Sequence, residues 1–190
     1  MNFVEDLRRS LRALKDGGII LYPTDTIWGL GCDATNSSSV QKIREIKSRR
    51  ADSKSLIILV SDLMMLERYV KAIPETASRL ISVSTSPLTI IYPEGINLAE
   101  GICSNDGSVG IRICNDKFCR ELIRQFSKPL VSTSANITGQ PTPSNFIEIN
   151  KEIIKSVDYT VKYRQKDQQV LFASPIIKVE NNGVFKILRK

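Results

Sequence analysis

The chain contains no histidine among its 190 residues. This absence removes serine–histidine and cysteine–histidine nucleophilic catalysis, and it removes the usual histidine-ligated zinc sites of hydrolases. Any catalysis must therefore depend on Lys, Arg, Asp, Ser, Thr or a bound metal ion.

Long apolar runs and paired cysteines are also absent. No run approaches the length of a membrane span, and the N-terminal segment carries acidic residues, unlike a signal peptide. Because no two cysteines form a C-x-x-C pair, we expect neither a zinc site nor a redox motif. These features predict a cytoplasmic protein without a membrane partner, whose cysteines are small buried side chains. The four cysteines are Cys32, Cys103, Cys114 and Cys119.

The composition is that of an ordinary globular protein. Hydrophobic residues make up 42% and charged residues 25% of the chain, and its length fits a single domain over residues 1–190. The net charge of +7 favours anionic partners such as a nucleotide, phosphate or RNA. A solubilising surface explains the same charge equally well.

Helical and strand-like segments alternate along the chain, without repeats. This order predicts an α/β or α+β fold, with a mixed sheet covered by helices. Apolar spacing predicts helices over 2–16, 38–47, 62–71, 74–83, 116–126 and 144–154, with N-caps at Asn2, Ser38 or Ser39, Asp116 and Ser144. Short apolar runs predict strands over 19–22, 27–32, 56–60, 88–92, 109–113, 130–133, 159–161, 175–179 and 184–188.

The segment YPTDTIWGLG follows the first predicted strand. Hydroxyl and carboxylate side chains cluster there at Thr24, Asp25 and Thr26, at a strand end where α/β sheets bind ligands. Gly29 and Gly31 would let the backbone approach a ligand closely. A capped turn, without any ligand, explains the same residues.

Four cations lie close together after the second predicted helix. Lys47, Arg49, Arg50 and Lys54 could clamp a triphosphate, Arg through bidentate bonds and Lys as a point charge. A solvated basic loop is the alternative.

Two later segments place polar groups beside apolar strands. Arg112 is flanked by isoleucines in GSVGIRI, so it must either find an anionic partner or reach solvent. In PLVSTSANITGQPTPS, the side chains of Ser132, Thr133, Ser134 and Asn136 follow a short strand. Such groups suit hydrogen bonds to an amino acid or phosphate, and they also favour a long turn.

Taken together and in order, these segments resemble the YrdC family, the threonylcarbamoyl-adenylate synthases. The resemblance runs from Gly17 to Arg189 and is carried by GGIILYPTDTIWGLG, the Lys-x-Arg of KSR, SPLTIIYP, SVGIRI, PLVSTSANITGQPTPS and the final ILR. The Lys-x-Arg at Lys47 and the later Ser-x-Asn at Ser134 form the family's most specific signature.

The resemblance implies a fold and a reaction. The fold is a twisted mixed sheet flanked by helices around a basic, concave crevice. The reaction condenses L-threonine, bicarbonate and ATP to threonylcarbamoyl-AMP and pyrophosphate, for N6-threonylcarbamoyladenosine in tRNA. Mg²⁺ would arrive with ATP rather than at a metal site of the protein. The implied partners are tRNA threonylcarbamoyl-transferase proteins, which act downstream, and RNA or tRNA.

The resemblance also implies roles for individual residues. The catalytic set is Lys47, Arg49, Ser134 and Asn136. ATP binding is implied for Lys47, Arg49, Lys54, Ser108, Asn136, Ser144 and Arg189, and threonine binding for Thr26, Arg112, Ser134 and Ser174.

The chain departs from the family pattern at several positions. Arg50 stands where proline usually follows the Lys-x-Arg, so Arg49 and Arg50 could exchange roles in the phosphate clamp. Ser86 replaces a common glycine, Trp28 replaces a frequent tyrosine, and the usual glycine after Arg189 is absent.

Two other functions fit parts of the sequence. A non-catalytic module of the same fold could bind double-stranded RNA or a tRNA stem in the basic crevice, although Ser134 and Asn136 favour the active enzyme. The similarly folded dihydroxybutanone-phosphate synthases need acidic metal ligands and a histidine, and this chain has no histidine.

Overall fold

The computed structural model describes residues 3–47 and 56–190. Its first helix, α1 (Phe3–Lys15), buries Leu7 and Leu14 on one face. The helix ends at Lys15, and Gly17 turns the chain away from it with a φ of 71°, the left-handed conformation that glycine adopts without strain. The predicted first helix and its glycine stop are confirmed, while its predicted cap, Asn2, lies outside the described residues.

Helices and strands alternate as the sequence indicates. The other helices are α2 (Ser37–Lys47), α3 (Leu63–Glu67), α4 (Glu75–Val83), α5 (Lys117–Phe126), the 3-10 helix η1 (Phe146–Glu148) and α6 (Lys151–Lys155). The strands are β1 (Ile20–Tyr22), β2 (Gly29–Gly31), β3 (Ile57–Val60), β4 (Thr89–Tyr92), β5 (Val109–Ile113), β6 (Leu130–Ser134), β7 (Tyr159–Thr160), β8 (Ile176–Val179) and β9 (Phe185–Arg189).

These strands form one mixed sheet of nine strands in the order β7-β1-β2-β6-β3-β5-β4-β8-β9. Three neighbouring pairs are parallel, namely β1 with β7, β3 with β5, and β4 with β8. The other neighbours are antiparallel. The mixed α/β fold predicted from the sequence is therefore confirmed.

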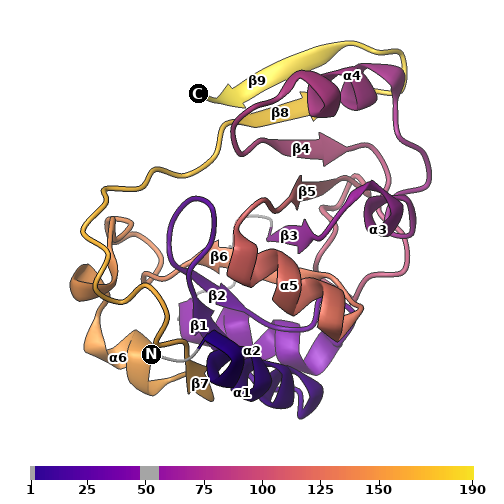
Figure 1. Ribbon diagram of the computed structural model, residues 1–190. Coiled ribbons are helices and arrows are strands. Elements are labelled where there is room, and N and C mark those ends of the chain that lie inside the picture. The colour runs from indigo at the N-terminus through magenta and orange to yellow at the C-terminus, as the bar shows by residue number, and fades with distance from the viewer. Residues whose placement is uncertain (1–2, 48–55) are drawn as a thin grey trace.

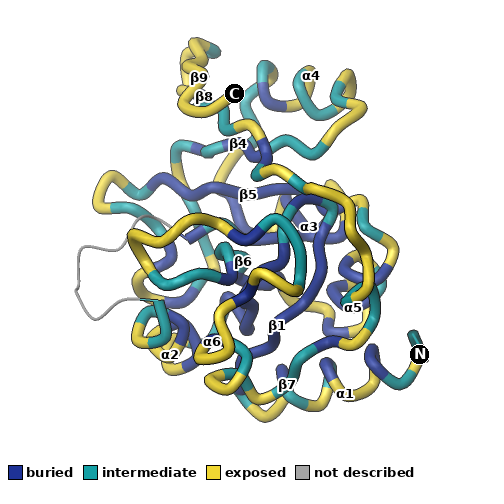
Figure 2. Tube along the Cα trace, turned by 90° about the vertical axis from the view of Figure 1, so that its left-hand side faces the viewer, coloured by how far each residue is buried: buried dark blue, intermediate teal, exposed yellow. Residues whose placement is uncertain are grey.

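Helices cover the two faces of the sheet unequally. Helices α1, α3, α4 and α5 lie on one face and α2 lies on the other, as the two perpendicular views show (Figures 1 and 2). The aromatic rings of Phe3 and Phe118 join α1 to α5, with centroids 5.4 Å apart. The central strands are buried, whereas β9 at the edge of the sheet is exposed (Figure 2).

Capping groups explain where the structure differs from the expected helix starts. Asn36, not Ser38 or Ser39, caps α2, because its Oδ1 accepts hydrogen bonds from the backbone N–H groups of both serines. Asp116 caps α5 as predicted, through the N–H of Cys119 at 2.8 Å. The helix expected from 62 to 71 ends at Glu67 because the chain at Val70 pairs with Gly95 as a β-bridge.

The helix predicted from Ser144 to residue 154 is wrong. The structure has two short helices there, η1 and α6, which are capped separately by Asn145 and Asn150. The hydroxyl of Ser144 instead donates to the carboxylate of Glu148. Asparagine caps a helix as readily as serine, so the sequence alone could not decide between adjacent candidates.

Candidate active site

A cavity of about 640 Å³ opens on the sheet face that carries α2. Strand positions two apart line it, such as Gly110 and Arg112 on β5 and Ser132 and Ser134 on β6. Because side chains alternate across a strand, these residues belong to one face of the sheet. The last two turns of α2, the loop after β6 and the segment before β8 form its walls.

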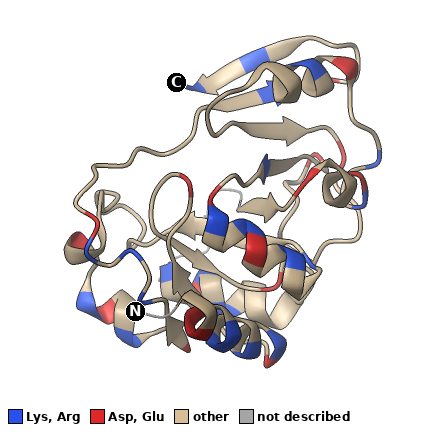
Figure 3. Ribbon diagram, in the orientation of Figure 1, with Lys and Arg blue, Asp and Glu red and all other residues tan. Residues whose placement is uncertain are grey.

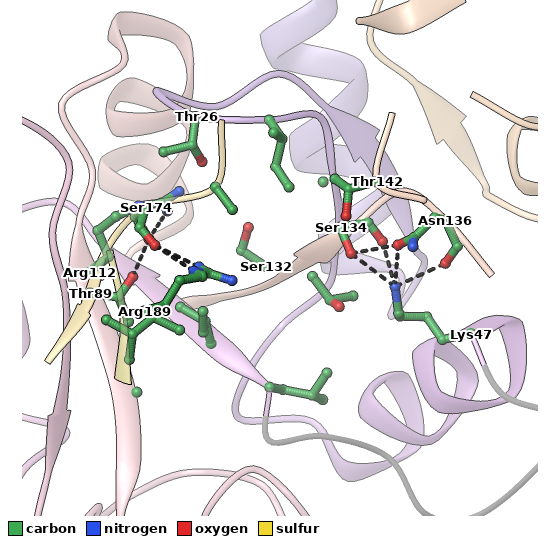
Figure 4. A pocket seen from close by; sticks show the side chains of 18 of the residues that line it. Thr26, Lys47, Thr89, Arg112, Ser132, Ser134, Asn136, Thr142, Ser174 and Arg189 are labelled. Atoms are coloured by element: carbon green, nitrogen blue, oxygen red, sulfur yellow. Dashed lines mark hydrogen bonds between the residues drawn. The ribbon is translucent and has the colours of Figure 1, made fainter. Parts of the chain in front are cut away.

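One end of the cavity is built around the ammonium group of Lys47 (Figure 4). Its Nζ donates to the backbone oxygen of Ser134 at 2.6 Å and to that of Asn136 at 2.9 Å. It also lies 3.1 Å from Asn136 Oδ1 and 3.3 Å from Ser134 Oγ. Four acceptor oxygens surround an ammonium that has three protons, so each of its N–H groups can be paired. These contacts hold Lys47 against the loop after β6.

Further hydrogen bonds close this cluster. The hydroxyl of Ser134 lies 2.5 Å from Asn136 Oδ1, and Asn136 Nδ2 donates to the backbone oxygen of Gln140 at 2.6 Å. The N–H of Thr138 donates to the backbone oxygen of Lys47 at 2.9 Å. The end of α2 and the 134–140 loop are thus held together by both side chains and backbone.

Burial lowers the pKa of Lys47 from its ordinary value of 10.5 to about 8. The cause is loss of hydration of the charged ammonium in a site where all of its described partners are neutral oxygens. A perturbed lysine within a cavity is typical of functional sites.

The opposite end of the cavity is built around Arg112 and Ser174 (Figure 4). Arg112 Nη2 lies 3.0 Å from the carboxylate of Asp25, and Nη1 donates to Ser174 Oγ at 3.2 Å. Ser174 Oγ is also 2.7 Å from the hydroxyl of Thr89. The guanidinium of Arg189 donates twice to the backbone oxygen of Ser174, at 2.9 and 2.7 Å.

The structure decides between the two alternatives for Arg112. Its side chain is only 5% exposed and pairs with Asp25, which is 8% exposed. The arginine therefore does not reach solvent through the strand, and it faces the cavity from the middle of the sheet.

Thr26 and the two glycines of the same segment have different surroundings. The hydroxyl of Thr26 is buried 3.1 Å from that of Thr24, which also donates to the backbone oxygen of Ile27. Gly29 lines the cavity. Gly31 does not, and a Cβ there would meet the ring of Tyr22 at 2.5 Å, so internal packing explains this glycine.

The structure brings most of the predicted site residues to this one cavity. Seven of them line it: Thr26, Lys47, Arg112, Ser134, Asn136, Ser174 and Arg189. Ser108 and Ser144 do not line it, and their hydroxyls donate to Asp106 and Glu148. Arg49 and Lys54, with Arg50, lie outside the described residues.

Sequence reasoning did not assign several residues that line the cavity. Thr89 lies in SPLTIIYP and Ser104 shortly before GSVGIRI, but neither was given a role, and Arg44 reads as an ordinary helix residue. The sheet order brings β4 beside β5 and β8, and this places Thr89 next to Ser174. The helical spacing of Arg44 and Lys47 was the one local signal that could have placed Arg44 here.

The described residues provide no acidic metal centre. Within residues 3–47 and 56–190, no group of three or more Cys, Asp or Glu side chains is placed to hold a metal ion. In the same part of the chain, no helix is both long and apolar enough to cross a membrane.

The fold is a mixed sheet with a cavity across one face, and cationic side chains line both ends of that cavity, Lys47 at one and Arg112 and Arg189 at the other. Residues 12–190 match the model of the Sua5/YciO/YrdC family, which is described as "Telomere recombination". The chain belongs to this family.

Proteins named threonylcarbamoyl-AMP synthase are similar in sequence. The one from Stenotrophomonas maltophilia is 32% identical over 155 residues, which cover 80% of this chain and 83% of that protein. The one from Psychromonas ingrahamii is 34% identical over 149 residues, which cover 77% of this chain and 78% of that protein.

Solved structures show the same fold. Escherichia coli YciO superimposes with a TM-score of 0.83 at 21% identity, over 100% of this chain and 90% of that one. Sua5 of P. abyssi, solved in complex with L-threonine, gives a TM-score of 0.81 at 24% identity over 94% of this chain. This chain spans 52% of that Sua5.

Proposed function

We propose that the protein is an L-threonylcarbamoyladenylate synthase, which makes threonylcarbamoyl-AMP and pyrophosphate from L-threonine, bicarbonate and ATP for the modification of tRNA. The observation that carries the proposal is that the Lys47 cluster and the Arg112–Ser174 cluster open onto one cavity (Figure 4). The names of the relatives support the same activity.

The proposed chemistry needs positioning more than a reactive side chain. The threonine amine and bicarbonate form a carbamate with loss of water, a carbamate oxygen attacks the α-phosphate of ATP, and pyrophosphate leaves. Negative charge develops on phosphate oxygens, so preorganised cations and hydrogen-bond donors supply much of the rate enhancement. A chain without histidine can perform such a reaction.

The two ends of the cavity take different parts of the ligand in this proposal. Lys47, Ser134 and Asn136 hold the nucleotide and its reacting phosphate. Thr26, Arg112 and Ser174 hold threonine, together with Ser134 at the reacting centre. Arg189 acts on the nucleotide, and Arg49 and Lys54 complete the phosphate clamp. Direct contact of Ser108 and Ser144 with ATP is not part of the proposal, because their side chains do not line the cavity.

Mg²⁺ is part of the proposal and enters with ATP. Hard divalent cations are commonly held by nucleotide phosphates with few protein ligands. Activity should therefore disappear in EDTA and return with Mg²⁺, and an enzyme fully active in excess chelator would contradict this part.

The proposal has three further parts. The product is delivered to tRNA threonylcarbamoyl-transferase proteins, the enzyme is cytoplasmic, and residues 1–190 form a single domain.

Pyrophosphate release with a panel of amino acids tests the function. The protein is incubated with ATP, Mg²⁺, bicarbonate and each amino acid in turn. The proposal predicts release only with L-threonine, and only when bicarbonate is present. Release that is independent of bicarbonate would indicate an amino-acid-activating enzyme instead.

RNA binding stays an alternative prediction for the same fold. Lys and Arg are interspersed with Asp and Glu on α1 and α5, and further basic residues lie on β8 and β9 (Figure 3). If RNA is the ligand, affinity should fall steeply with salt and should not depend on threonine.

A further inference from the structure

Asp25 and Arg112 form a buried ion pair behind the threonine end of the cavity. The carboxylate Oδ1 lies 3.0 Å from Nη2 of the guanidinium, and the two side chains are 8% and 5% exposed. The contact is held by charge rather than by a well-directed hydrogen bond, since Asp25 Oδ1 has no hydrogen-bond partner among the described residues. Each charge would be costly to bury without the other.

The carboxylate is anchored on its far side. The backbone N–H of Asn115 donates to Asp25 Oδ2 at 3.1 Å, which ties the segment after β1 to the turn before α5. Arg164 holds the same segment, because its Nη1 donates to the backbone oxygen of Thr24 at 3.0 Å. Asp25 is therefore a fixed charge rather than a mobile one.

Asp25 and Ser174 together set the direction of the guanidinium. Nη2 faces Asp25 while Nη1 donates to Ser174 Oγ, which in turn contacts Thr89. Arg112 lines the cavity, but Asp25 does not. Any effect of Asp25 on a ligand in the cavity must therefore pass through its neighbours.

We infer that Asp25 is a positioning residue for the threonine site, which holds the Arg112 guanidinium in the orientation that receives the substrate carboxylate. The inference rests on the function proposed above. Because Asp25 offsets the charge of Arg112, recognition depends on the direction of the N–H groups more than on net attraction. Loss of the Asp25 charge frees the guanidinium to turn and leaves it without its compensating partner.

The test compares steady-state kinetics of Asp25→Asn with those of the wild type. This substitution keeps the size of the side chain and one acceptor oxygen. We expect KM for L-threonine to rise at least about tenfold, equivalent to about 1.4 kcal/mol. KM for ATP should stay within about twofold, because the Lys47 cluster is not changed. A purely structural role would instead lower the amount of folded enzyme and leave both KM values alone.

Two further variants make the test specific. Asp33→Asn removes another buried carboxylate, which pairs with Lys128 and does not line the cavity, and it should leave both KM values unchanged. The double variant Asp25→Asn/Arg112→Gln should bind threonine no more weakly than Arg112→Gln alone, because Asp25 acts through Arg112.

The outcomes separate this inference from the proposed function. An active wild type whose threonine KM is unchanged or lowered by Asp25→Asn would overturn the inference alone. Additive losses in the double variant would also overturn it. A wild type that releases no pyrophosphate with threonine would overturn the proposed function and the inference together.

Discussion

Lys47 Nζ lies 2.9 Å from the backbone oxygen of Asn136 and 3.1 Å from its Oδ1, although 89 positions separate the two residues in sequence. The contact joins the last turn of α2 to the loop after β6. It places the two halves of the family signature at the same end of one cavity. Had they lain on opposite sides of the molecule, a shared adenylate site would have been impossible.

Removal of the Lys47 ammonium should abolish most of the activity. Lys47→Met keeps the apolar stem but loses the charge and every Nζ contact, so we expect kcat/KM to fall at least about a hundredfold, or about 2.7 kcal/mol. Lys42→Met is the matched control, because Lys42 lies on the same helix and its Nζ bonds the backbone oxygen of Gly17. Circular dichroism should show that both variants are folded. Full activity in Lys47→Met would contradict the assignment.

The lowered pKa of Lys47 predicts a pH dependence of activity. If the ammonium is the active form, kcat/KM should decline as pH rises through about 8, where the group loses its proton. Lys47→Arg keeps its charge in this range, so whatever activity it retains should not show that decline. A wild-type profile that stays flat to pH 10 would argue against a protonated Lys47.

The same lowered pKa predicts that the contribution of Lys47 to stability rises with pH, whereas activity should fall. Because folding lowers the pKa of Lys47 from 10.5 to about 8, the unfolded chain binds this proton more tightly. The unfolding free energy of the wild type, relative to Lys47→Met, should therefore rise between pH 8 and 10.5. Urea denaturation of both proteins across this range measures the difference, and a falling difference would contradict it.

The Ser134 hydroxyl should contribute to turnover by ordering Asn136. Ser134→Ala removes the contact with Asn136 Oδ1 at 2.5 Å and leaves the backbone bond from Lys47 in place. We expect kcat to fall about tenfold, or about 1.4 kcal/mol. In a double-mutant cycle with Asn136→Ala, the two losses should be less than additive. Fully independent losses would show that the hydroxyl acts without Asn136.

Alanine at Gly31 and alanine at Gly110 should have different effects on the unfolding free energy. A Cβ at Gly31 would lie 2.5 Å from Tyr22 Cε1 and 3.0 Å from the Val131 oxygen, so Gly31→Ala should lower the unfolding free energy by about 3 kcal/mol or more. A Cβ at Gly110 meets only ordinary contacts, 3.6 Å or more away, so Gly110→Ala should change the unfolding free energy by less than about 1 kcal/mol. Urea denaturation measures both values. Equal stabilities would contradict the packing around Tyr22.

Local sequence predicted helix ends correctly where a single residue marked the end. The glycine stop after α1 and the Asp116 cap of α5 follow from side-chain chemistry within a few residues. The start of α2 and the 144–154 region were misassigned because asparagine and serine compete for the same capping role. Local sequence provides no means of ranking such neighbours.

The site was predicted only as far as the family signature reached. Residue patterns left Arg112 open between solvent and a buried partner, and only the fold places Asp25 beside it. Thr89 lies within SPLTIIYP, but no role followed from that segment, because its contact with Ser174 depends on β4 lying beside β8, a pairing between strands far apart in sequence. Ser108 and Ser144 were assigned to the site from the resemblance alone, and the structure pairs their hydroxyls with Asp106 and Glu148 outside the cavity lining.

Isotope incorporation tests the central claim most directly. The protein is incubated with ¹³C-bicarbonate, L-threonine, ATP and Mg²⁺, and the nucleotide products are analysed by mass spectrometry. We predict a threonylcarbamoyl-AMP that carries one ¹³C atom from the wild type, and its near absence from Lys47→Met and Arg112→Gln. A wild type that forms no such adenylate, or a product without the label, would contradict the account.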